Sequence, residues 1–116
     1  SFGFKHGVPI DADMILDVRF LPNPHWDENL RPFSGLDQNV KEFVLSQVLS
    51  DDFLERLDGL LNLVLPAYVQ EGRSYLTIGI GCTGGRHRSV AMAEEVARRL
   101  ASTGYHPRVT HRDINS

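Results

Sequence analysis

Residues 76–90 read LTIGIGCTGGRHRSV, and this stretch decides the fold. Its first part, Leu76 to Ile80, is rich in β-branched residues, as buried strands are. Two adjacent glycines follow, and then apolar residues recur at helical spacing from Val90 to Leu100. The order predicts a strand, a glycine-bearing loop and a helix. We expect residues 76–102 to form an anion-binding unit, because backbone N–H groups at the start of a helix favour negative charge.

The loop from Cys82 to Ser89 adds side-chain donors to those N–H groups. Arginine and histidine side chains donate hydrogen bonds to phosphate oxygens. The loop is therefore predicted to hold a phosphate- or sulfate-like anion. Its predicted ligand-binding residues are Cys82, Thr83, Gly84, Gly85, Arg86, His87, Arg88 and Ser89.

The same spacing fits a catalytic alternative. Cys82 to Ser89 matches C-x5-R-S, the phosphate loop of cysteine-dependent phosphatases, in which a thiolate attacks phosphorus. Cys82 would then be the nucleophile and Arg88 would hold the phosphate oxygens, while Asp17 or Asp27 would serve as general acid. A Walker A motif is excluded, because no lysine follows the second glycine.

The rest of the chain alternates between strand and helix patterns. Strands are expected at Ser1–Lys5, Met14–Phe20, Ser74–Ile80 and Arg108–His111, and residues 21–27, with two prolines, are expected to be irregular. Helices are expected from Asp37 to about Leu49, from Ser50 or Asp51 to before Gly72, and from Ser89 to Ser102. The pattern predicts a single α/β domain over residues 1–116. We expect three layers, with helices flanking a short, mostly parallel sheet of about four strands.

Two predicted loops leave the carboxyl ends of strands, where parallel sheets bind ligands. These loops, residues 21–27 and 82–89, are therefore expected to converge on one cleft. Asp17 and Arg19 share a strand face close to the first loop. The predicted site thus also includes Asp17, Arg19, Asn23 and His25. Trp26 and Phe33 are expected in the core or at a subunit interface.

Composition limits the function classes. A chain of 116 residues with net charge −3 does not have the composition of a dedicated nucleic-acid binder. The charge is uneven, however, since residues 84–116 carry six arginines and three acidic residues. One cysteine forms no internal disulfide, no apolar run approaches the ~20 residues of a membrane span, and no cluster has metal-ligand spacing. We expect a cytoplasmic domain without a metal.

Several long blocks resemble the RNase adapter protein RapZ family, and together they cover nearly the whole chain. The blocks are Ser1–Lys5, Pro9–Asp13, Asp17–Trp26, Leu30–Pro32, Arg73–Thr77, Gly79–Val90 and His111–Arg112. The resemblance implies the carboxyl-terminal domain of a two-domain bacterial cytoplasmic regulator. The amino-terminal domain, outside this sequence, would bind and slowly hydrolyse ATP or GTP.

The resemblance also implies what this domain does. It would be non-catalytic and need no cofactor, and it would sense an amino-sugar phosphate such as glucosamine-6-phosphate, or UDP-N-acetylglucosamine. It would also bind small regulatory RNA for presentation to an RNase, as part of a homo-oligomer. RNA contacts would come from Arg86, Arg98, Arg99, Arg108 and Arg112, although Arg98 and Arg99 also fit an ordinary solvated helix face. The sequence departs from RNA-binding members, because Arg86 replaces an expected lysine and residues 113–116 lack a basic run.

Overall fold

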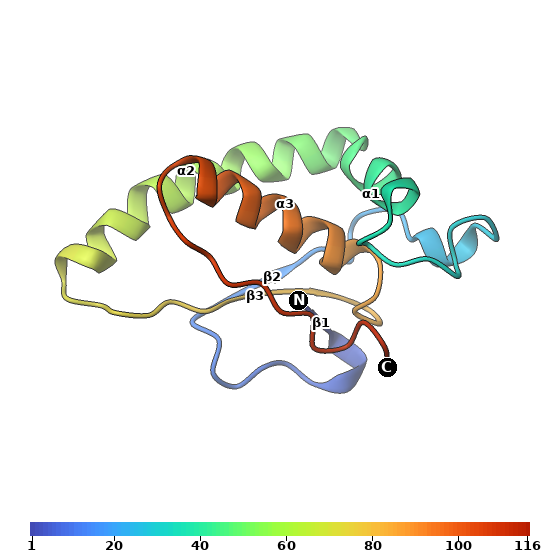
Figure 1. The fold of residues 1–116 in the computed structure, drawn as a ribbon, viewed down its shortest axis with the longest axis horizontal. Helices are drawn as coiled ribbons and strands as arrows, with labels where there is room; N and C mark the ends of the chain where they lie inside the picture. The colour runs from blue at the N-terminus through green and yellow to red at the C-terminus, as the bar shows by residue number, and fades with distance from the viewer.

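The computed structural model describes residues 1–116 and contains three strands, three α-helices and two short 3₁₀ turns. Figure 1 shows their order and arrangement. The elements are β1 (Phe2–Gly3), η1 (Phe4–His6), β2 (Met14–Asp17), η2 (Pro24–Trp26), α1 (Gln38–Leu45), α2 (Val48–Gln70), β3 (Ile78–Cys82) and α3 (Arg88–Ser102).

The sheet is entirely parallel, with strand order β1-β3-β2. Phe2 pairs with Gly81 on one side of β3, and Met14 pairs with Ile78 on the other. The predicted α/β class and parallel sheet are confirmed. The central strand is the one that begins the 76–90 stretch, so the loop after it leaves from the middle of the sheet.

The sheet has three strands rather than about four, because residues 108–111 do not form a strand. The backbone of residues 108–112 bonds only to Ser1, whose carbonyl oxygen accepts from the N–H of Arg112 and whose amino group donates to the carbonyl of Thr110. Two bonds around a single residue do not extend into a ladder.

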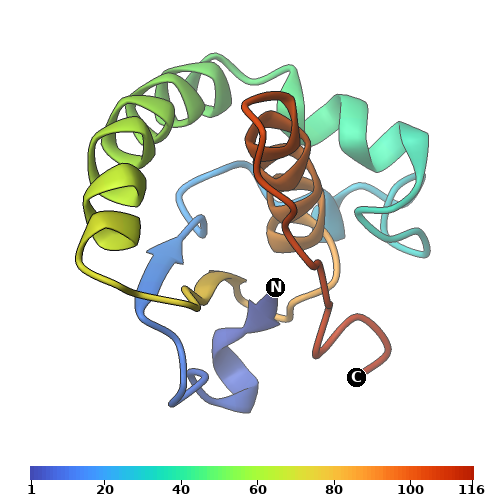
Figure 2. The ribbon, with the colours of Figure 1, turned by 60° about the vertical axis from the view of Figure 1, so that its left-hand side comes forward.

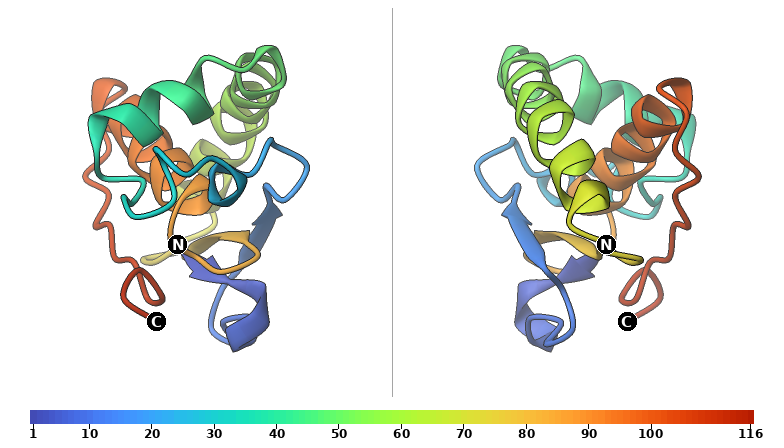
Figure 3. Two further views of the ribbon diagram at one scale, coloured as in Figure 1. Left: turned by 90° about the vertical axis from the view of Figure 1, so that its right-hand side faces the viewer. Right: turned by 90° about the vertical axis from the view of Figure 1, so that its left-hand side faces the viewer.

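The molecule has two layers rather than the expected three. All three helices lie on one side of the strands (Figures 1 and 3). Ile80 and Cys82 point into the core beneath the helices, with Leu54, Leu61, Met92 and other buried apolar side chains. Figure 2 shows α2 and α3 together on that side.

The opposite face of β3 carries glycines instead of side chains. A carbon atom added at Gly81 would lie 2.5 Å from the Phe2 ring and 2.6 Å from the Phe4 ring. These two rings meet edge to face with centroids 4.8 Å apart. Two phenylalanines from the start of the chain therefore cover this face where a helix layer was expected.

Several boundaries differ from the sequence prediction. β2 ends at Asp17 instead of Phe20, and β3 begins at Ile78 instead of Ser74. The loop predicted as irregular contains the turn η2, because the Asn23 side chain caps it and Pro24 fits its first position. Trp26 and Phe33 were expected in the core or at a subunit interface; they are 77% and 43% exposed, so they do not lie in the core of this chain. No helix is long and apolar enough to cross a membrane.

Candidate functional site

The loop between β3 and α3 is folded around the Cys82 sulfur. Cys82 is the last residue of β3 and is buried, and its Sγ lies 3.1 Å from the Ser89 Oγ in the first turn of α3. Burial raises the pKa of the thiol, but hydrogen bonds from Ser89 and Gly85 and the charge of Arg88 outweigh burial. The pKa of Cys82 therefore lies below its ordinary value.

The backbone of this loop presents a run of donors. The N–H groups of Gly84 to Val90 donate to no oxygen of the protein, and those of Gly85 and Ser89 turn toward the Cys82 sulfur. Gly85 has a φ of 82°, a conformation that side-chain-bearing residues rarely adopt. Most of these residues are buried, and N–H groups without an oxygen acceptor at the start of a helix are chemically suited to an anion.

Arg88 brings a buried positive charge to the same place. Its Nη1 donates to the carbonyl oxygens of Arg19 at 2.8 Å and Leu21 at 2.9 Å, and its Nη2 donates to the Thr83 hydroxyl at 3.3 Å. Its Nε is buried without a partner, and no carboxylate forms an ion pair with it. Burial lowers the pKa of Arg88 and outweighs the charges of Cys82 and Asp17, which raise it.

Arg86 and His87 hold the loop to its neighbours. Arg86 donates to the carbonyl oxygens of Pro32 at 2.9 Å and Ile114 at 2.8 Å. The Nε2 of His87 lies 3.1 Å from the Arg31 carbonyl oxygen, so this nitrogen carries the hydrogen. Burial lowers the pKa of His87 against the opposing effect of its backbone hydrogen bonds. Both side chains therefore make contacts that hold the loop in place.

The segment that follows β2 meets this loop, as the sequence predicts. Arg88 bonds to its backbone at Arg19 and Leu21, and His87 bonds to Arg31 further along. The Arg31 Nε in turn donates to the His25 carbonyl at 2.6 Å. Two segments more than 50 residues apart are therefore joined through backbone carbonyl groups.

The remaining predicted residues lie along this second segment. Asp17 and Arg19 form an ion pair of 2.7 Å, which lowers the pKa of Asp17 through hydrogen bonds from Arg19. The Arg19 guanidinium stacks on the Phe4 ring at 3.8 Å. The Asn23 side chain accepts from the N–H of His25, whose ring is exposed and meets Trp26 edge to face.

One cationic residue at the loop was missed in the sequence. Lys5 donates its N–H to the Thr83 carbonyl at 3.2 Å, and its Cε would lie 3.9 Å from a carbon atom added at Gly84. The signal was available, because Lys5 follows the carboxyl end of a strand parallel to β3. A strand of two residues is too short to be recognised in the sequence, so the position of Lys5 beside the loop is not predicted.

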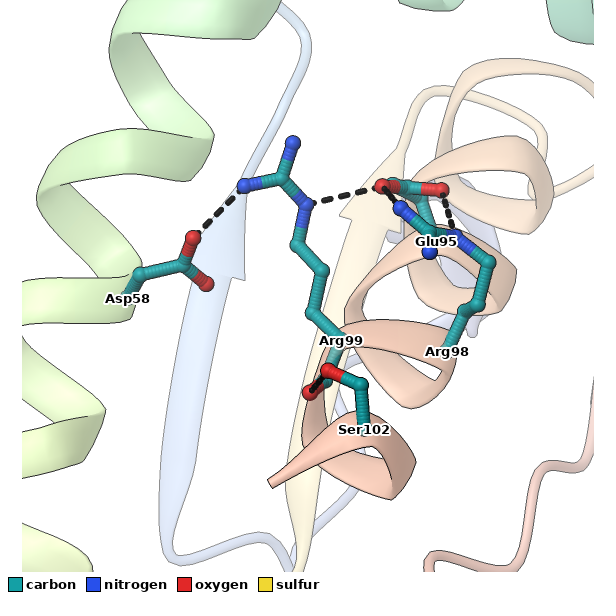
Figure 4. A network of polar contacts seen from close by, with 5 residues as sticks. All are labelled: Asp58, Glu95, Arg98, Arg99 and Ser102. Atoms are coloured by element: carbon teal, nitrogen blue, oxygen red, sulfur yellow. Dashed lines mark hydrogen bonds and ion pairs between the residues drawn. The ribbon is translucent and has the colours of Figure 1, made fainter.

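The arginines proposed to contact RNA are mostly engaged. Figure 4 shows that Arg99 bridges Glu95 on its own helix and Asp58 on α2, at 2.8 and 2.6 Å, and that Arg98 also pairs with Glu95. Arg112 pairs with Asp113. Arg108 is exposed and forms no ion pair. The positive charges of Arg98, Arg99 and Arg112 are therefore paired with acidic side chains of the same domain.

No group of three His, Cys, Asp or Glu side chains is close enough to hold a metal ion.

The fold and loop define a small α/β domain in which a cysteine- and arginine-containing loop links the central parallel strand to a helix. Residues 1–115 match the family described as the RapZ C-terminal domain, and the chain belongs to this family.

Its relatives include proteins named nucleotide-binding protein. It is 55% identical to one from Frankia casuarinae and 56% identical to one from Corynebacterium jeikeium, each over 98% of this chain. A further relative from Trichlorobacter lovleyi is also 56% identical. The chain spans about two fifths of the length of these relatives.

Proposed function

We propose that this domain is the ligand-sensing part of a RapZ-like regulator and binds a phosphorylated amino sugar, without turnover, at the loop Cys82–Ser89. The observation that carries the proposal is the buried Arg88, which forms no ion pair with a carboxylate, beside a run of N–H groups that donate to no oxygen of the protein. Burying a cation without a counter-charge is costly. A phosphate group in the loop would place a full negative charge beside Arg88 and accept from those N–H groups at once.

The second segment suits the sugar part of such a ligand. Asp17 accepts hydrogen bonds from a hydroxyl or a sugar amine, whereas Arg19, His25 and Lys5 donate to phosphate or hydroxyl oxygens. Asp17 is ionised, because Arg19 lowers its pKa, so it also attracts the positive charge of an amino sugar. Glucosamine-6-phosphate and a UDP-amino sugar both combine these groups.

The same contacts weigh against the phosphatase alternative. A general acid must hold a proton at the working pH, and the lowered pKa of Asp17 deprives it of one. The nucleophile must also be accessible, and Cys82 is only 3% exposed. We expect no hydrolysis of p-nitrophenyl phosphate. A steady release of phosphate that disappears in Cys82→Ser would establish the phosphatase instead.

RNA is a weaker candidate for the same donors. RNA needs an extended basic surface, and four of the five candidate arginines here are held by acidic side chains or carbonyl groups. In the longer relatives, binding of ATP or GTP would belong to the part of the protein outside this chain. We expect the whole protein to act in the cytoplasm on an RNase or another regulatory protein, as an oligomer.

Calorimetry tests the binding proposal with inorganic phosphate, glucosamine-6-phosphate and UDP-N-acetylglucosamine. Arg88→Ala should weaken phosphate binding by about 1.5–3 kcal/mol, the contribution of a charge-assisted hydrogen bond. Because Arg88 also holds backbone carbonyls, Lys5→Ala serves as a second variant that leaves the core intact. Arg98→Ala, on the exposed face of α3, is the matched control and should bind normally.

The ligands separate the outcomes. Sugar phosphates that bind more tightly than phosphate alone support a sugar subsite at Asp17 and His25. Equal affinities for inorganic phosphate and the two sugar ligands would confine the binding site to the loop Cys82–Ser89. No binding of any of the three by the wild-type chain, combined with tight binding of a structured small RNA, would replace the sensor proposal by an RNA-binding one.

A further inference from the structure

The segment 110–116, here called the strap, packs against the first residues of the chain. The N–H of Arg112 donates to the Ser1 carbonyl at 3.1 Å, and the Asp113 carboxylate accepts from the N–H of Gly3 at 2.7 Å. Asp113 is only 5% exposed. Figures 2 and 3 show this segment running down past the N-terminus of the chain.

The strap also contacts the phosphate loop itself. A carbon atom added at Gly85 would lie 2.9 Å from the Asp113 Cβ and 2.6 Å from the Gly3 nitrogen. Gly85 is therefore enclosed by the strap on one side and β1 on the other. One residue further, Arg86 donates to the Ile114 carbonyl at 2.8 Å. Two successive loop residues are fixed by the strap.

Asp113 is held in place by a set of charge-assisted hydrogen bonds. Arg112 donates to both carboxylate oxygens of Asp113, and its Nη2 also reaches the Gly7 carbonyl. Burial raises the pKa of Asp113, but Arg112 and the N–H of Gly3 outweigh it and leave the pKa below its ordinary value. The carboxylate is thus charged, and it ties strap, β1 and loop together.

We propose that the strap controls the anion affinity of the loop, with Asp113 as the positioning residue that holds Gly85 in its left-handed conformation. The inference rests on the proposed function of the loop. Gly85 lies within the run of N–H groups that donate to no oxygen of the protein, so releasing it lets those donors turn away from a common centre. Coupling between two sites is reciprocal. A bound phosphate therefore stabilises the docked strap, and any partner that pulls the strap away weakens phosphate binding.

Phosphate titration of the 116-residue chain by calorimetry tests the coupling. Asp113→Ala should lower phosphate affinity about tenfold or more, a typical size for coupling between sites. Asp113→Asn, which keeps an acceptor for Gly3 but loses the charge, should lower it less. The control is Ser50→Ala, which removes the buried hydrogen bond of 2.6 Å from Ser50 to Val44 in another part of the fold. It lowers stability without touching the loop and should retain wild-type affinity.

A second measurement tests whether phosphate binding in the loop stabilises the strap. Saturating phosphate should slow proteolytic cleavage and amide exchange in the strap of the wild-type chain, and it should do so much less in Arg88→Ala. If folded Asp113→Ala binds phosphate with wild-type affinity, or loses no more affinity than Ser50→Ala does, the inference about the strap is wrong. The proposed function of the loop would not be affected by that result. A wild-type chain that binds no phosphate would overturn the proposed function, and this inference with it.

Discussion

The Cys82 Sγ and the Ser89 Oγ lie 3.1 Å apart and join the end of the central strand to the first turn of the following helix. Both side chains are buried. The hydroxyl, the loop N–H groups and Arg88 all favour the thiolate, while burial favours the thiol. The balance lowers the pKa of Cys82 below its ordinary value, so Cys82 reports on the electrostatics of the loop.

Ser89→Ala should raise the pKa of Cys82, because it removes the largest of the effects that lower it. The ultraviolet absorbance of the thiolate as a function of pH measures this shift. Ser102→Ala removes a hydroxyl at the other end of the same helix and should leave the titration unchanged. A Cys82 pKa that stays the same or falls in Ser89→Ala would contradict the assigned hydrogen bond.

The stability of the domain should fall as the solution becomes acidic, partly because of His87. The unfolded chain protonates this histidine below about pH 6.5, whereas burial delays protonation in the folded chain to lower pH. The unfolded state then binds more protons, so His87 costs no stability above that pH and destabilises the fold below it. Urea unfolding from pH 7.5 to about 5 measures the loss. His87→Gln should flatten this dependence, and an unchanged slope would assign it to other groups.

Removing the Arg99 side chain should destabilise the domain without changing its affinity for phosphate. Arg99 connects α3 to α2 through Asp58 and also pairs with Glu95 (Figure 4). A partly exposed network of this kind contributes about 0.5–1 kcal/mol, and high salt should reduce the difference from wild type. Denaturant unfolding of Arg99→Ala measures the change. Reduced phosphate affinity in this variant would mean that the helix pair communicates with the loop.

Trp26 should report on the sugar part of the ligand. It is the only tryptophan of the chain, it is 77% exposed, and its ring meets the ring of His25. Glucosamine-6-phosphate contacting His25 should change the fluorescence of Trp26, whereas inorganic phosphate in the loop should change it little. His25→Ala should abolish the difference between the two ligands. Identical responses to both would remove His25 from the proposed sugar subsite.

The sequence predicts the central strand, the loop and the last helix well, because all three follow from one continuous pattern. The last helix ends at Ser102, as expected, and Gly104 with its positive φ follows the end of the helix. The meeting of the loops after β2 and β3 also follows from local rules, since both leave carboxyl ends of parallel strands. The ligand roles of Asp17, Arg19, Asn23 and His25 remain predictions.

The other features depend on distant contacts that a local pattern does not contain. The prediction of a second helix layer was wrong, because Gly79 and Gly81 leave room for the rings of Phe2 and Phe4 on that face of the sheet. The prediction of a fourth strand was wrong, because the backbone of residues 108–112 bonds only to Ser1. Arg86 and His87 look like ligand donors in the sequence, yet both donate to carbonyl oxygens of other segments. The composition of a loop does not reveal which of its donors the fold itself uses.

The bond between Gly3 and Asp113 spans 110 positions of the chain and has a consequence for synthesis. During translation, the first strand leaves the ribosome long before the carboxylate that fixes it. Contacts between the two ends of a chain form late and slow folding. The central loop is therefore completed only when nearly the whole domain has emerged. A nascent chain stalled before Asp113 would lack the carboxylate that accepts from the N–H of Gly3.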